Sequence, residues 1–366
     1  MNILIDYLAS NTGGGKTVAE NQINNLLRLD KKNKYICLFS EGNRILESEY
    51  GNCKVIYVKN DSLIKRLWYQ KIRIPVLIRD YNVDVLFCPN NYSLYFDKNV
   101  KTVIMYQNSN IFFSIFLGKN LLVRLKYLII RLLSEYSKRK SDVNLFVSKF
   151  IKNGNNGKVV YLGIENNDNI IYENFKNEKE YDVVLILSNF SVHKNIKTFV
   201  DSIEYYQNKY KKKLKVLIVG GDRDLKKIKY VKEYIENKNS LSVMITGLIP
   251  KKAVRKYILK SKLYVSTSLL EAFSLTQFEA LNCNIPILLS DIPVFREVCG
   301  DSDIYFNPKD PENIADKIHD VFENYEYYVN MISKIKKYAS KFTWENHARK
   351  LIEIFESVYA NFKETI

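Results

Sequence analysis

Short, continuously apolar runs alternate with longer segments of helical periodicity along almost the whole chain. These runs are rich in Val, Ile and Leu and do not alternate with polar residues, which is typical of strands buried on both faces of a parallel sheet. Such runs lie at 2–8, 34–40, 53–59, 83–88, 101–106, 142–148 and 158–162, and again at 182–188, 214–220, 242–247, 263–268, 286–290 and 303–306. The regular succession of strand and helix predicts α/β architecture built from βαβ units.

A polar, Asn-rich and charged stretch at residues 166–181 separates the two sets of strands. This composition is typical of a linker between domains. We therefore predict an N-terminal domain over 1–165 and a C-terminal domain over 182–344, each a Rossmann-like, doubly wound parallel sheet. Apolar positions between Trp344 and Phe362 recur at helical spacing, which predicts a long amphipathic helix at the end of the sequence.

Length, hydropathy and cysteine content limit the classes of protein to which this chain can belong. The sequence has 366 residues, which is long for one domain and comfortable for two. It opens on a strand-like run, so we expect no signal peptide, and no stretch is apolar enough to predict a transmembrane helix. The five cysteines are scattered without a CxxC pair, which argues against a disulfide framework or a zinc site and indicates a cytoplasmic location.

The net charge of +16 points to anionic partners. An excess of this size attracts nucleic acid, anionic lipid or phosphorylated small molecules. We do not expect nucleic acid to be a partner, because the sequence contains no recognisable nucleic-acid-binding motif. Heavy use of Asn, Lys, Ile and Tyr is also what an AT-rich genome produces, so part of the Lys excess carries no function.

Two glutamates, Glu271 and Glu279, are separated by seven residues directly after the run at 263–268. Ser274 and Gln277 have the spacing of a capping box, so we predict that a helix begins at Ser274, with Glu279 about 7 Å further along its axis. Free N–H groups at the start of this helix would suit a phosphate, and Glu279 could accept hydrogen bonds from ribose hydroxyls. On spacing alone, the plainer interpretation as a solvated loop acid and a surface helix acid is favoured.

A second candidate is Lys194, which follows the run at 182–188 at the predicted start of the next helix. A lysine there can neutralise a diphosphate as a point charge. Because the chain has many lysines, a plain surface lysine is the favoured interpretation of any single one. We expect the neighbouring His193 to be solvated rather than catalytic.

Three glycines, Gly13, Gly14 and Gly15, follow the first predicted strand. They superficially resemble a phosphate-binding P-loop, but the position of that motif's first glycine is held by Ser10. ATPase or kinase chemistry is therefore disfavoured, while a glycine-rich turn still allows a ligand to approach the backbone closely.

The segment 111–140 combines a run of phenylalanines with basic residues. If exposed, it would contact anionic lipid at a membrane surface. The alternative is a buried crossover helix with a charged outer stripe, and the two interpretations are nearly balanced. The loop's Phe112, Phe113 and Phe116 slightly favour contact with a greasy acceptor or a bilayer.

Taken together, these segments resemble the retaining GT-B glycosyltransferases of glycosyltransferase family 4. The spacing of Glu271 and Glu279 matches that family's Glu-x7-Glu motif, and Ile285-Pro286 and Tyr305-Phe306-Asn307-Pro308 resemble its downstream segments. Thr246-Gly247-Leu248 is similar to a loop near the nucleotide base. The glycines at 13–15 and the strand at 83–89 are similar to parts of its N-terminal domain.

The resemblance implies two Rossmann-like domains facing a cleft and a metal-independent reaction without a cofactor. The donor would be a nucleotide-diphosphate sugar bound mainly by the C-terminal domain, and helix 345–366 would pack back on the N-terminal domain. The resemblance assigns three kinds of role to residues of this chain. Catalysis is assigned to Glu271 and Lys194, and donor binding to Glu279, Ser274, Leu275, Thr276, Gly247, Leu248, Ser188 and Asn189. Acceptor or cleft contacts are assigned to Gly13, Gly14, Gly15, Gln107 and Asn108.

The sequence departs from the family at a few of these positions. Many members have an arginine where this chain has Ser188, and a histidine where it has Gln107-Asn108. The motif's usual glycines are replaced by Ala272 and Ser274, which are still small. Neutralisation of the diphosphate is thus expected to be weaker or to come from elsewhere, and Gln107 and Asn108 cannot act as a titrating base at the position of the family's histidine.

We therefore expect a retaining, hexosyltransferase-type enzyme that transfers a sugar to a glycan or a polyprenyl-linked acceptor in the synthesis of bacterial surface polysaccharide, lipopolysaccharide or glycolipid. It would be cytoplasmic, with peripheral contact to the inner membrane through 111–140. One rival is another GT-B activity, such as a nucleotide-sugar epimerase. A second rival is a non-catalytic subunit that binds a nucleotide sugar.

Overall fold

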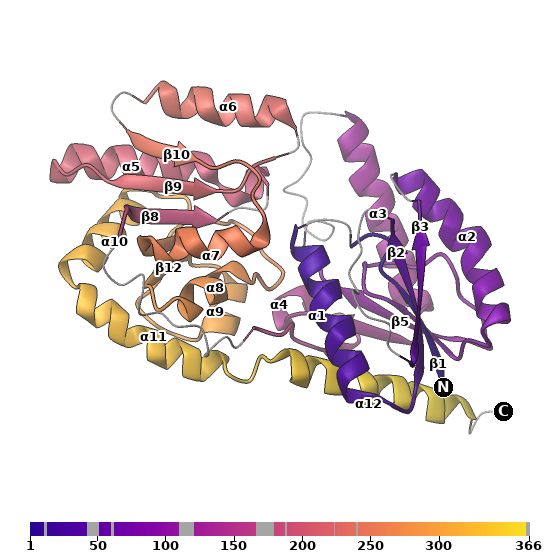
Figure 1. Ribbon diagram of the computed structural model, residues 1–366. Coiled ribbons are helices and arrows are strands. Elements are labelled where there is room, and N and C mark those ends of the chain that lie inside the picture. Colours follow the sequence, from indigo (N-terminus) through magenta and orange to yellow (C-terminus); the bar gives the residue numbers. More distant parts are fainter. Residues whose placement is uncertain are drawn as a thin grey trace. The chain divides into compact units, whose positions relative to one another are not determined.

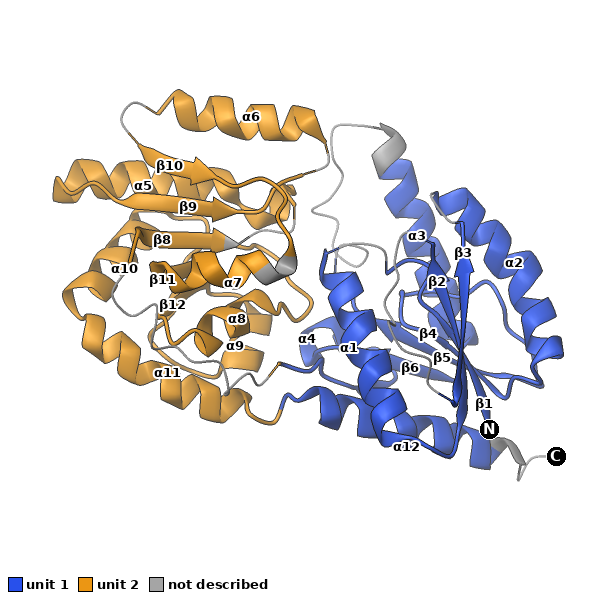
Figure 2. Ribbon diagram, in the orientation of Figure 1, with its two compact units in different colours: residues 1–164, 342–366 blue, residues 165–341 orange. Residues whose placement is uncertain are grey.

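The chain divides into two compact units, which Figure 2 colours separately. Unit 1 comprises Met1–Ile164 and Phe342–Ile366, and unit 2 comprises Glu165–Lys341. The computed structural model describes residues 1–10, 13–41, 51–59, 62–109, 121–165, 179–186, 189–222, 224–238 and 241–363. The predicted linker falls largely on 166–178, outside these described residues, and unit 2 ends three residues before the predicted limit of 344.

Unit 1 is a seven-stranded parallel sheet with helices packed against it (Figure 1). Its strands lie in the order β3-β2-β1-β4-β5-β6-β7. In the centre, Ile5 of β1 is aligned with Cys37 of β2 and Phe87 of β4. The strands are β1 (Asn2–Asp6), β2 (Lys34–Ser40), β3 (Cys53–Val58), β4 (Val85–Cys88), β5 (Lys101–Tyr106), β6 (Val143–Phe146) and β7 (Lys158–Val159); the helices are α1 (Gly13–Leu29), α2 (Leu63–Asp80), α3 (Leu121–Lys140), α4 (Lys149–Lys152) and α12 (Trp344–Lys363).

Unit 2 is a six-stranded parallel sheet in the order β10-β9-β8-β11-β12-β13. Leu185 of β8 is aligned with Ile218 of β9 and Val265 of β11. The strands are β8 (Tyr181–Ile186), β9 (Lys215–Val219), β10 (Ser242–Ile245), β11 (Ser261–Ser266), β12 (Ile287–Ser290) and β13 (Tyr305–Phe306); the helices are α5 (Ile196–Tyr210), α6 (Leu225–Glu236), α7 (Lys251–Leu259), α8 (Thr276–Asn282), α9 (Pro293–Cys299), α10 (Pro311–Glu323) and α11 (Tyr325–Ala339).

The thirteen predicted strands are all present, and the doubly wound α/β fold is confirmed. The apolar runs identified them because a central strand of a parallel sheet is covered on both faces. In β1, β4 and β8, for example, Leu4, Phe87 and Val184 are fully buried. The strand ends were less well predicted, since the last residues of several runs belong to the loops that follow.

Local signals set where several helices begin. The side chain of Asp310 accepts hydrogen bonds from the N–H groups of Glu312 and Asn313, and Pro311 occupies the first turn of α10. An N-cap acid followed by proline favours a helix start because it satisfies free N–H groups and fixes φ. Within the described residues, no helix combines the length and hydrophobicity needed to cross a bilayer.

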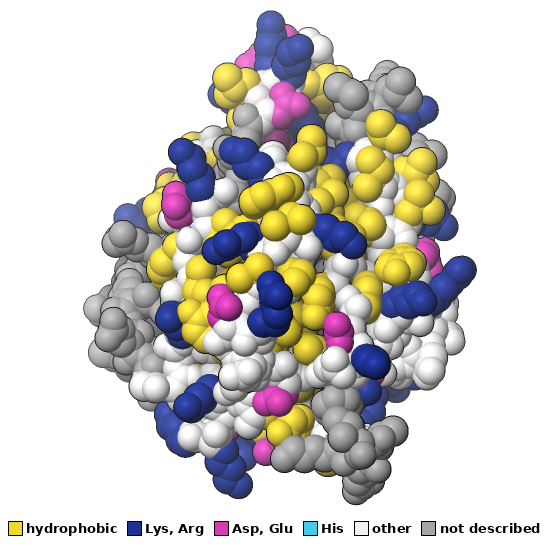
Figure 3. All heavy atoms as spheres, turned by 90° about the vertical axis from the view of Figure 1, so that its right-hand side faces the viewer, with side chains coloured by type: hydrophobic (Ala, Val, Ile, Leu, Met, Phe, Trp, Pro, Cys, Tyr) yellow, Lys and Arg dark blue, Asp and Glu magenta, His cyan; other side chains and the backbone are white. Residues whose placement is uncertain are grey.

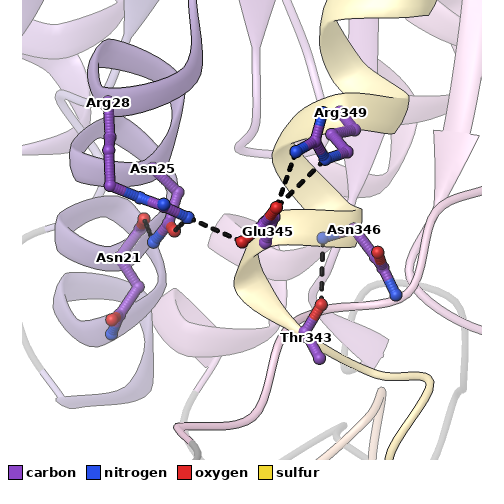
Figure 4. Close-up of polar contacts among 7 residues, drawn as sticks. All are labelled: Asn21, Asn25, Arg28, Thr343, Glu345, Asn346 and Arg349. Atoms are coloured by element: carbon purple, nitrogen blue, oxygen red, sulfur yellow. Dashed lines mark hydrogen bonds and ion pairs between the residues drawn. The ribbon is translucent and has the colours of Figure 1, made fainter.

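The last helix, α12, packs against α1 within unit 1 (Figure 4). Arg28 of α1 forms an ion pair with Glu345, whose other oxygen accepts a hydrogen bond from Arg349. Gly163 lies beneath the start of α12, where an added Cβ would lie 2.2 Å from the Trp344 nitrogen. This position therefore tolerates only glycine if α12 is to dock as it does.

A buried polar chain anchors α12 more deeply. The ring Nδ1 of His347 lies 2.7 Å from the Tyr161 carbonyl, and its Nε2 lies 2.7 Å from the side-chain amide nitrogen of Gln22. The hydroxyl of Tyr7 donates to the Gln22 side-chain oxygen. Because the carbonyl can only accept, Nδ1 carries the proton and Nε2 accepts from Gln22. Burial lowers the pKa of His347 to about 4, which keeps the ring neutral.

Candidate functional site

The sheet of unit 2 changes direction between β8 and β11. From β8, the chain runs outward through β9 and β10 and then returns to the other side of β8 with β11. Loops that leave the carboxyl ends of two such strands diverge, and the space between them is the usual ligand position in doubly wound sheets. Lys194 follows β8 and Glu271 follows β11, so the two loops at this switch point carry the two predicted catalytic residues.

Lys194 and Glu271 form an ion pair at this position. The Lys194 Nζ lies 2.6 Å from the Glu271 Oε1, and both side chains are largely buried. The Ser268 hydroxyl donates to the same glutamate oxygen at 2.8 Å. The pair is held by the backbone as well, because the Thr267 hydroxyl donates to the Lys194 carbonyl and the Leu269 N–H donates to the His193 carbonyl.

This environment keeps Glu271 ionised. Burial by itself would raise the pKa of the carboxyl, but the charge and hydrogen bond of Lys194 and the hydrogen bond of Ser268 outweigh it and hold the pKa below its usual value. The two loops therefore present one fixed negative and one fixed positive charge at the switch point. Such charges can orient hydroxyls and stabilise a leaving anion without rearrangement.

The expectation that His193 is solvated is wrong. The side chain is buried, within a 3-10 turn formed by Val192–Lys194. Burial and then the neighbouring Lys194 charge lower its pKa to about 4, so the ring is neutral near pH 7. Lys194 ends this turn rather than starting the next helix, because Asn195 adopts a left-handed conformation before α5 begins at Ile196.

The predicted start of the Glu279 helix is also wrong. Helix α8 begins at Thr276 after Leu275 as N-cap, with no side-chain capping bond. Ser274 has a φ of +62°, and the Gln277 side-chain amide donates to the Ser274 carbonyl instead of accepting from its N–H. A left-handed residue cannot continue a helix, so the capping box does not form.

Because α8 starts later, Glu279 lies in its first turn and is half-buried there. Tyr264 of β11 lies close to the start of this helix, since its hydroxyl is 2.7 Å from the Thr276 hydroxyl. Burial raises the pKa of Tyr264, and the charges of Glu271 and Glu279 raise it further. The charges of both carboxylates of the motif therefore act on the same tyrosine of β11.

The loops after β9 and β10 complete the same edge of the sheet. Gly247, with a φ of +72°, forms an isolated bridge with Gly220. An added Cβ on Gly221 would lie 3.2 Å from the Gly247 backbone, so these glycines allow two loops to pass closely. Leu248, next in the chain, is exposed. Gly247 and Leu248 therefore lie in the loop that follows the carboxyl end of β10.

Asn189 supports the loop after β8. Its side-chain oxygen accepts from the Ser191 N–H, and the neighbouring Phe190 N–H donates to Asp222 in the loop after β9. Ser188, the position at which many relatives of the resembled family have arginine, lies outside the described residues. Its role in donor binding stays a prediction, as do the roles of the other predicted site residues.

Unit 1 has a corresponding switch point between β1 and β4. The Ser10 hydroxyl donates to the Asn90 side chain, and the Asn90 amide donates to the Asp6 carbonyl. Gly13, Gly14 and Gly15 form the first turn of α1, with Gly13 at a φ of +54° and Gly14 having no atom within 4 Å of an added Cβ. The glycine-rich turn is thus open at the position predicted for it.

Gln107 and Asn108 follow β5 at the same edge of unit 1. Their N–H groups both donate to the side-chain oxygen of Asn91, whose amide donates back to the Asn108 carbonyl. Asn91 is buried with a φ of +73°. The side-chain oxygen of Gln107 is buried without a hydrogen-bond partner among the described residues.

Sequence reasoning missed the supporting residues of both edges. Ser268 and Thr267 close the apolar run at 263–268, and hydroxyls at the carboxyl end of a strand are a signal that could have identified them. Asn91 sits in Pro89-Asn90-Asn91 after a strand, a turn signal, since asparagine tolerates positive φ. Within the described part of the chain, no cluster of His, Cys, Asp or Glu is arranged to hold a metal ion.

Comparison with known sequences finds a match to a protein family within unit 2. Residues 167–338 match the family of glycosyl transferases group 1. An uncharacterized glycosyltransferase of Methanocaldococcus jannaschii is 24% identical over 61% of this chain and 62% of its own length. The O-antigen chain mannosyltransferase RfbU of Salmonella typhimurium is 28% identical over 51% of this chain and 49% of its own length. The chain thus spans 62% and 49% of the lengths of these two relatives.

Solved structures are similar over both units. The HepE protein of Anabaena, in complex with UDP-glucose, superposes with a TM-score of 0.74 at 16% identity, covering 98% of this chain and all of that one. Sucrose-phosphate synthase of Thermosynechococcus elongatus gives a TM-score of 0.73 at 14% identity, with 99% of this chain covered. The protein therefore has the GT-B fold, and its second unit matches the glycosyl transferases group 1 family.

Proposed function

We propose that the protein is a retaining glycosyltransferase of hexosyltransferase type, belonging to glycosyltransferase family 4, that uses a nucleotide-diphosphate sugar as donor. The observation that carries the proposal is the Lys194–Glu271 ion pair at the switch point of unit 2, within the segment that matches the family. Titratable groups with shifted pKa values at a sheet edge are typical of functional sites. The UDP-glucose bound by HepE is consistent with a nucleotide-sugar donor.

In this proposal, Lys194 faces the donor diphosphate and Glu271 accepts hydrogen bonds from hydroxyls of the transferred sugar. The bond between the sugar's anomeric carbon and the diphosphate breaks, and negative charge grows on the leaving phosphate, where the Lys194 ammonium stabilises it. The acceptor hydroxyl bonds to the same face of the anomeric carbon and passes its proton to the leaving phosphate. These steps need no titrating base from unit 1 and no metal ion.

Glu279 is assigned to the ribose of the donor. It lies in the first turn of α8, and its charge reaches Tyr264 together with that of Glu271. A carboxylate in this position can accept two hydroxyl hydrogen bonds, which are strong because the acceptor is charged. Ser274, Leu275 and Thr276 lie between the two glutamates and offer backbone N–H groups for which the described residues provide no acceptor.

The acceptor is proposed to be a glycan or a polyprenyl-linked saccharide on the cytoplasmic side of a bacterial membrane. The mannosyltransferase relative from Salmonella is named for the O-antigen chain, a surface polysaccharide. Acceptor contacts would come from the edge of unit 1 that carries Gly13–Gly15 and Gln107. Loops at the carboxyl ends of strands carry specificity in such folds, so the acceptor cannot be derived from the donor site.

The proposal is tested first by donor binding. Thermal unfolding is measured with UDP- and GDP-sugars, since a ligand that binds the folded state raises the melting temperature. Lys194→Met and Glu279→Ala should each raise the donor KM at least 10-fold. Lys209→Met is the matched control, because Lys209 is also paired with an acid but lies at the far end of α5. Unchanged donor kinetics in Glu279→Ala would remove the ribose assignment.

Turnover is then tested with a labelled donor and a bacterial membrane extract. The expected product carries the labelled sugar with the donor's anomeric configuration, which NMR of the purified product determines. Release of an altered nucleotide sugar without any acceptor would instead identify an epimerase. Donor binding without transfer to any component of the extract would identify a non-catalytic binding subunit.

A further inference from the structure

Helices α2 and α3 of unit 1 lie side by side. Leu63 and Leu67 of α2 and Leu133 of α3 pack against a small cluster formed by Ile130 and Tyr92. This cluster fixes which side of each helix faces the protein. The remaining side of each helix is therefore turned to solvent.

The polarity of α3 is inverted relative to an ordinary surface helix. Ser134 and Ser137 are fully buried, whereas Leu125, Leu128 and Leu132 are exposed, Leu132 by 61%. Surface helices of soluble proteins normally turn their apolar stripe to the core. Because these leucines recur at spacings of three and four residues, they form one continuous stripe on the outer side.

Helix α2 carries an exposed apolar stripe of its own. Ile64, Trp68 and Ile72 follow one another at intervals of four residues, and Ile64 and Trp68 are exposed by 79% and 57%. We call the six residues Ile64, Trp68, Ile72, Leu125, Leu128 and Leu132 the α2–α3 face. Isolated exposed apolar residues need no explanation, but two exposed stripes on helices that pack against one common cluster are typical of an interaction surface.

Positive charge is concentrated on the same two helices. Helices α2 and α3 contain eleven Lys and Arg against two Asp and Glu, which accounts for +9 of the chain's +16. They also hold six of the twelve arginines, including the exposed Arg73, Arg131 and Arg139. A compositional bias toward lysine would not place half of the arginines on two helices.

Figure 3 shows the side of the molecule that lies to the right in Figure 1, where α2 is found. Hydrophobic side chains gather there among lysines and arginines, and acidic side chains are sparse. A protein partner with acidic groups would match the charges but not the long apolar stripes. Nucleic acid would likewise leave Trp68 and the leucines without a partner.

We propose that the α2–α3 face docks on the surface of an anionic lipid bilayer. Helices that lie in the interface bury an apolar side in the acyl boundary and place Lys and Arg among the headgroups. Trp68 and Tyr136, which is also exposed, have the amphipathic rings that occur at this depth. In such a contact the two helices lie in the interface rather than across the bilayer. The inference is independent of the proposed transfer reaction.

The test is cosedimentation of the full chain with vesicles. Vesicles of equal parts phosphatidylcholine and phosphatidylglycerol should bind the protein, and binding should weaken as salt is raised. Vesicles of phosphatidylcholine alone should bind it far less. Each basic residue near an anionic surface contributes roughly five-fold to partitioning, so Lys71→Gln, Arg73→Gln and Arg131→Gln together should weaken binding by about 100-fold.

The apolar stripes are tested separately, with Trp68→Ser and Leu128→Ser in one variant. Both side chains are exposed, so the fold should persist, which the melting temperature verifies. Helix α6 provides the matched control: Leu225 is exposed by 77%, and Lys226, Lys227 and Lys229 are also exposed. Substituting these α6 residues by Ser and Gln should leave vesicle binding unchanged.

Several results would overturn the inference. One is absence of binding to anionic vesicles, and another is equal binding to neutral ones. A third is binding that persists in both α2–α3 variants. A fourth is a protein that does not bind vesicles but forms a dimer in sedimentation velocity, with the dimer lost in the Trp68→Ser, Leu128→Ser variant. The α2–α3 face would then join two copies of the chain. Donor binding is measured separately by thermal shift, so a failure of the membrane inference can be distinguished from a failure of the proposed transfer reaction.

Discussion

At the switch point of unit 2, a lysine–glutamate ion pair joins the two diverging loops, whereas at that of unit 1 the loops are joined by neutral side chains. Each edge also contains one buried carboxylate. Lys194 overcomes the effect of burial and lowers the pKa of Glu271. Burial raises the pKa of Asp6. The hydrogen bonds from the Gln70 amide and the Leu8 N–H, its closest partners, lower this pKa but compensate the effect of burial only in part.

The difference shows that a common sheet topology supplies a position but not its chemistry. Unit 2 keeps fixed charges at the edge of its sheet, which suits a charged donor. Unit 1 keeps hydrogen-bonding amides at its edge and carries its positive charge on the outer helices α2 and α3. An uncharged saccharide and an anionic surface are the partners proposed above for this second arrangement.

The largest expected effect comes from neutralising the charged edge. Glu271→Gln keeps the shape of the side chain but leaves the buried Lys194 charge without its counterion. We expect turnover to fall by at least about 100-fold and unfolding free energy by roughly 2–3 kcal/mol. Steady-state kinetics and urea unfolding measure the two losses. Activity close to that of the parent protein would show that the ion pair is structural only.

The two buried histidines, His193 in unit 2 and His347 in unit 1, should make stability depend on pH. Each has a pKa lowered to about 4, below the value of about 6.5 of an unfolded histidine. The unfolded chain therefore binds more protons below pH 6.5. Stability is fully present above that pH and is lost as the pH falls toward 4, by up to about 1.4 kcal/mol per pH unit for each histidine.

Urea unfolding at pH 7, 6 and 5 measures this loss. His347→Gln should remove the part of the pH dependence that belongs to unit 1, and His193→Gln the part that belongs to unit 2. A pH dependence that neither substitution alters would assign the titration to other groups.

A third test concerns Asn91, which supports the neutral edge of unit 1. Its left-handed backbone would suit glycine, but its side chain holds the N–H groups of Gln107 and Asn108. Asn91→Gly should therefore lower the unfolding free energy by about 1–2 kcal/mol, since lost hydrogen bonds outweigh relieved strain. A stabilised variant would show that the side chain contributes nothing to this edge.

Asp6→Asn tests the buried carboxylate of unit 1 and should have the opposite sign to Glu271→Gln. The amide keeps an acceptor for the Leu8 N–H. The Gln70 amide, whose nitrogen now donates to Asp6, would turn over so that its oxygen, buried without a hydrogen-bond partner among the described residues, accepts from the new amide. Because the folded state disfavours the Asp6 charge, we expect a gain of up to about 1 kcal/mol at pH 7. The gain should shrink as the pH falls, because the raised pKa of Asp6 lets the folded state bind a proton more readily than the unfolded chain.

The smallest effect is expected at Ser274, the left-handed residue of the charged edge. None of the hydrogen bonds found for the described residues uses its hydroxyl, so Ser274→Gly should only relieve the backbone. We expect a gain of about 0.5–1 kcal/mol, reduced by the greater entropy of glycine in the unfolded chain. Donor binding should be unchanged, which distinguishes a backbone role from contact through the hydroxyl.

The sequence by itself determined the strands and their division into two parallel sheets. Runs such as that ending at Cys88 are apolar on consecutive residues, a pattern typical of strands that are buried on both faces of a parallel sheet. The spacing of Glu271 and Glu279 likewise followed from the chain, since both belong to one strand–loop–helix unit. Residues close in sequence are constrained mainly by local conformation.

Tertiary structure alone decided which charges meet. Lys194 and Glu271 are 77 positions apart and come together because β8 and β11 are neighbours in the sheet. The same is true of the burial of His193, which depends on the β11 loop, and of the exposed apolar stripe of α3, where burial of Ser134 and Ser137 reverses the polarity that periodicity suggests. Periodicity gives the two sides of a helix, but which side is covered depends on strands and helices that are distant in sequence.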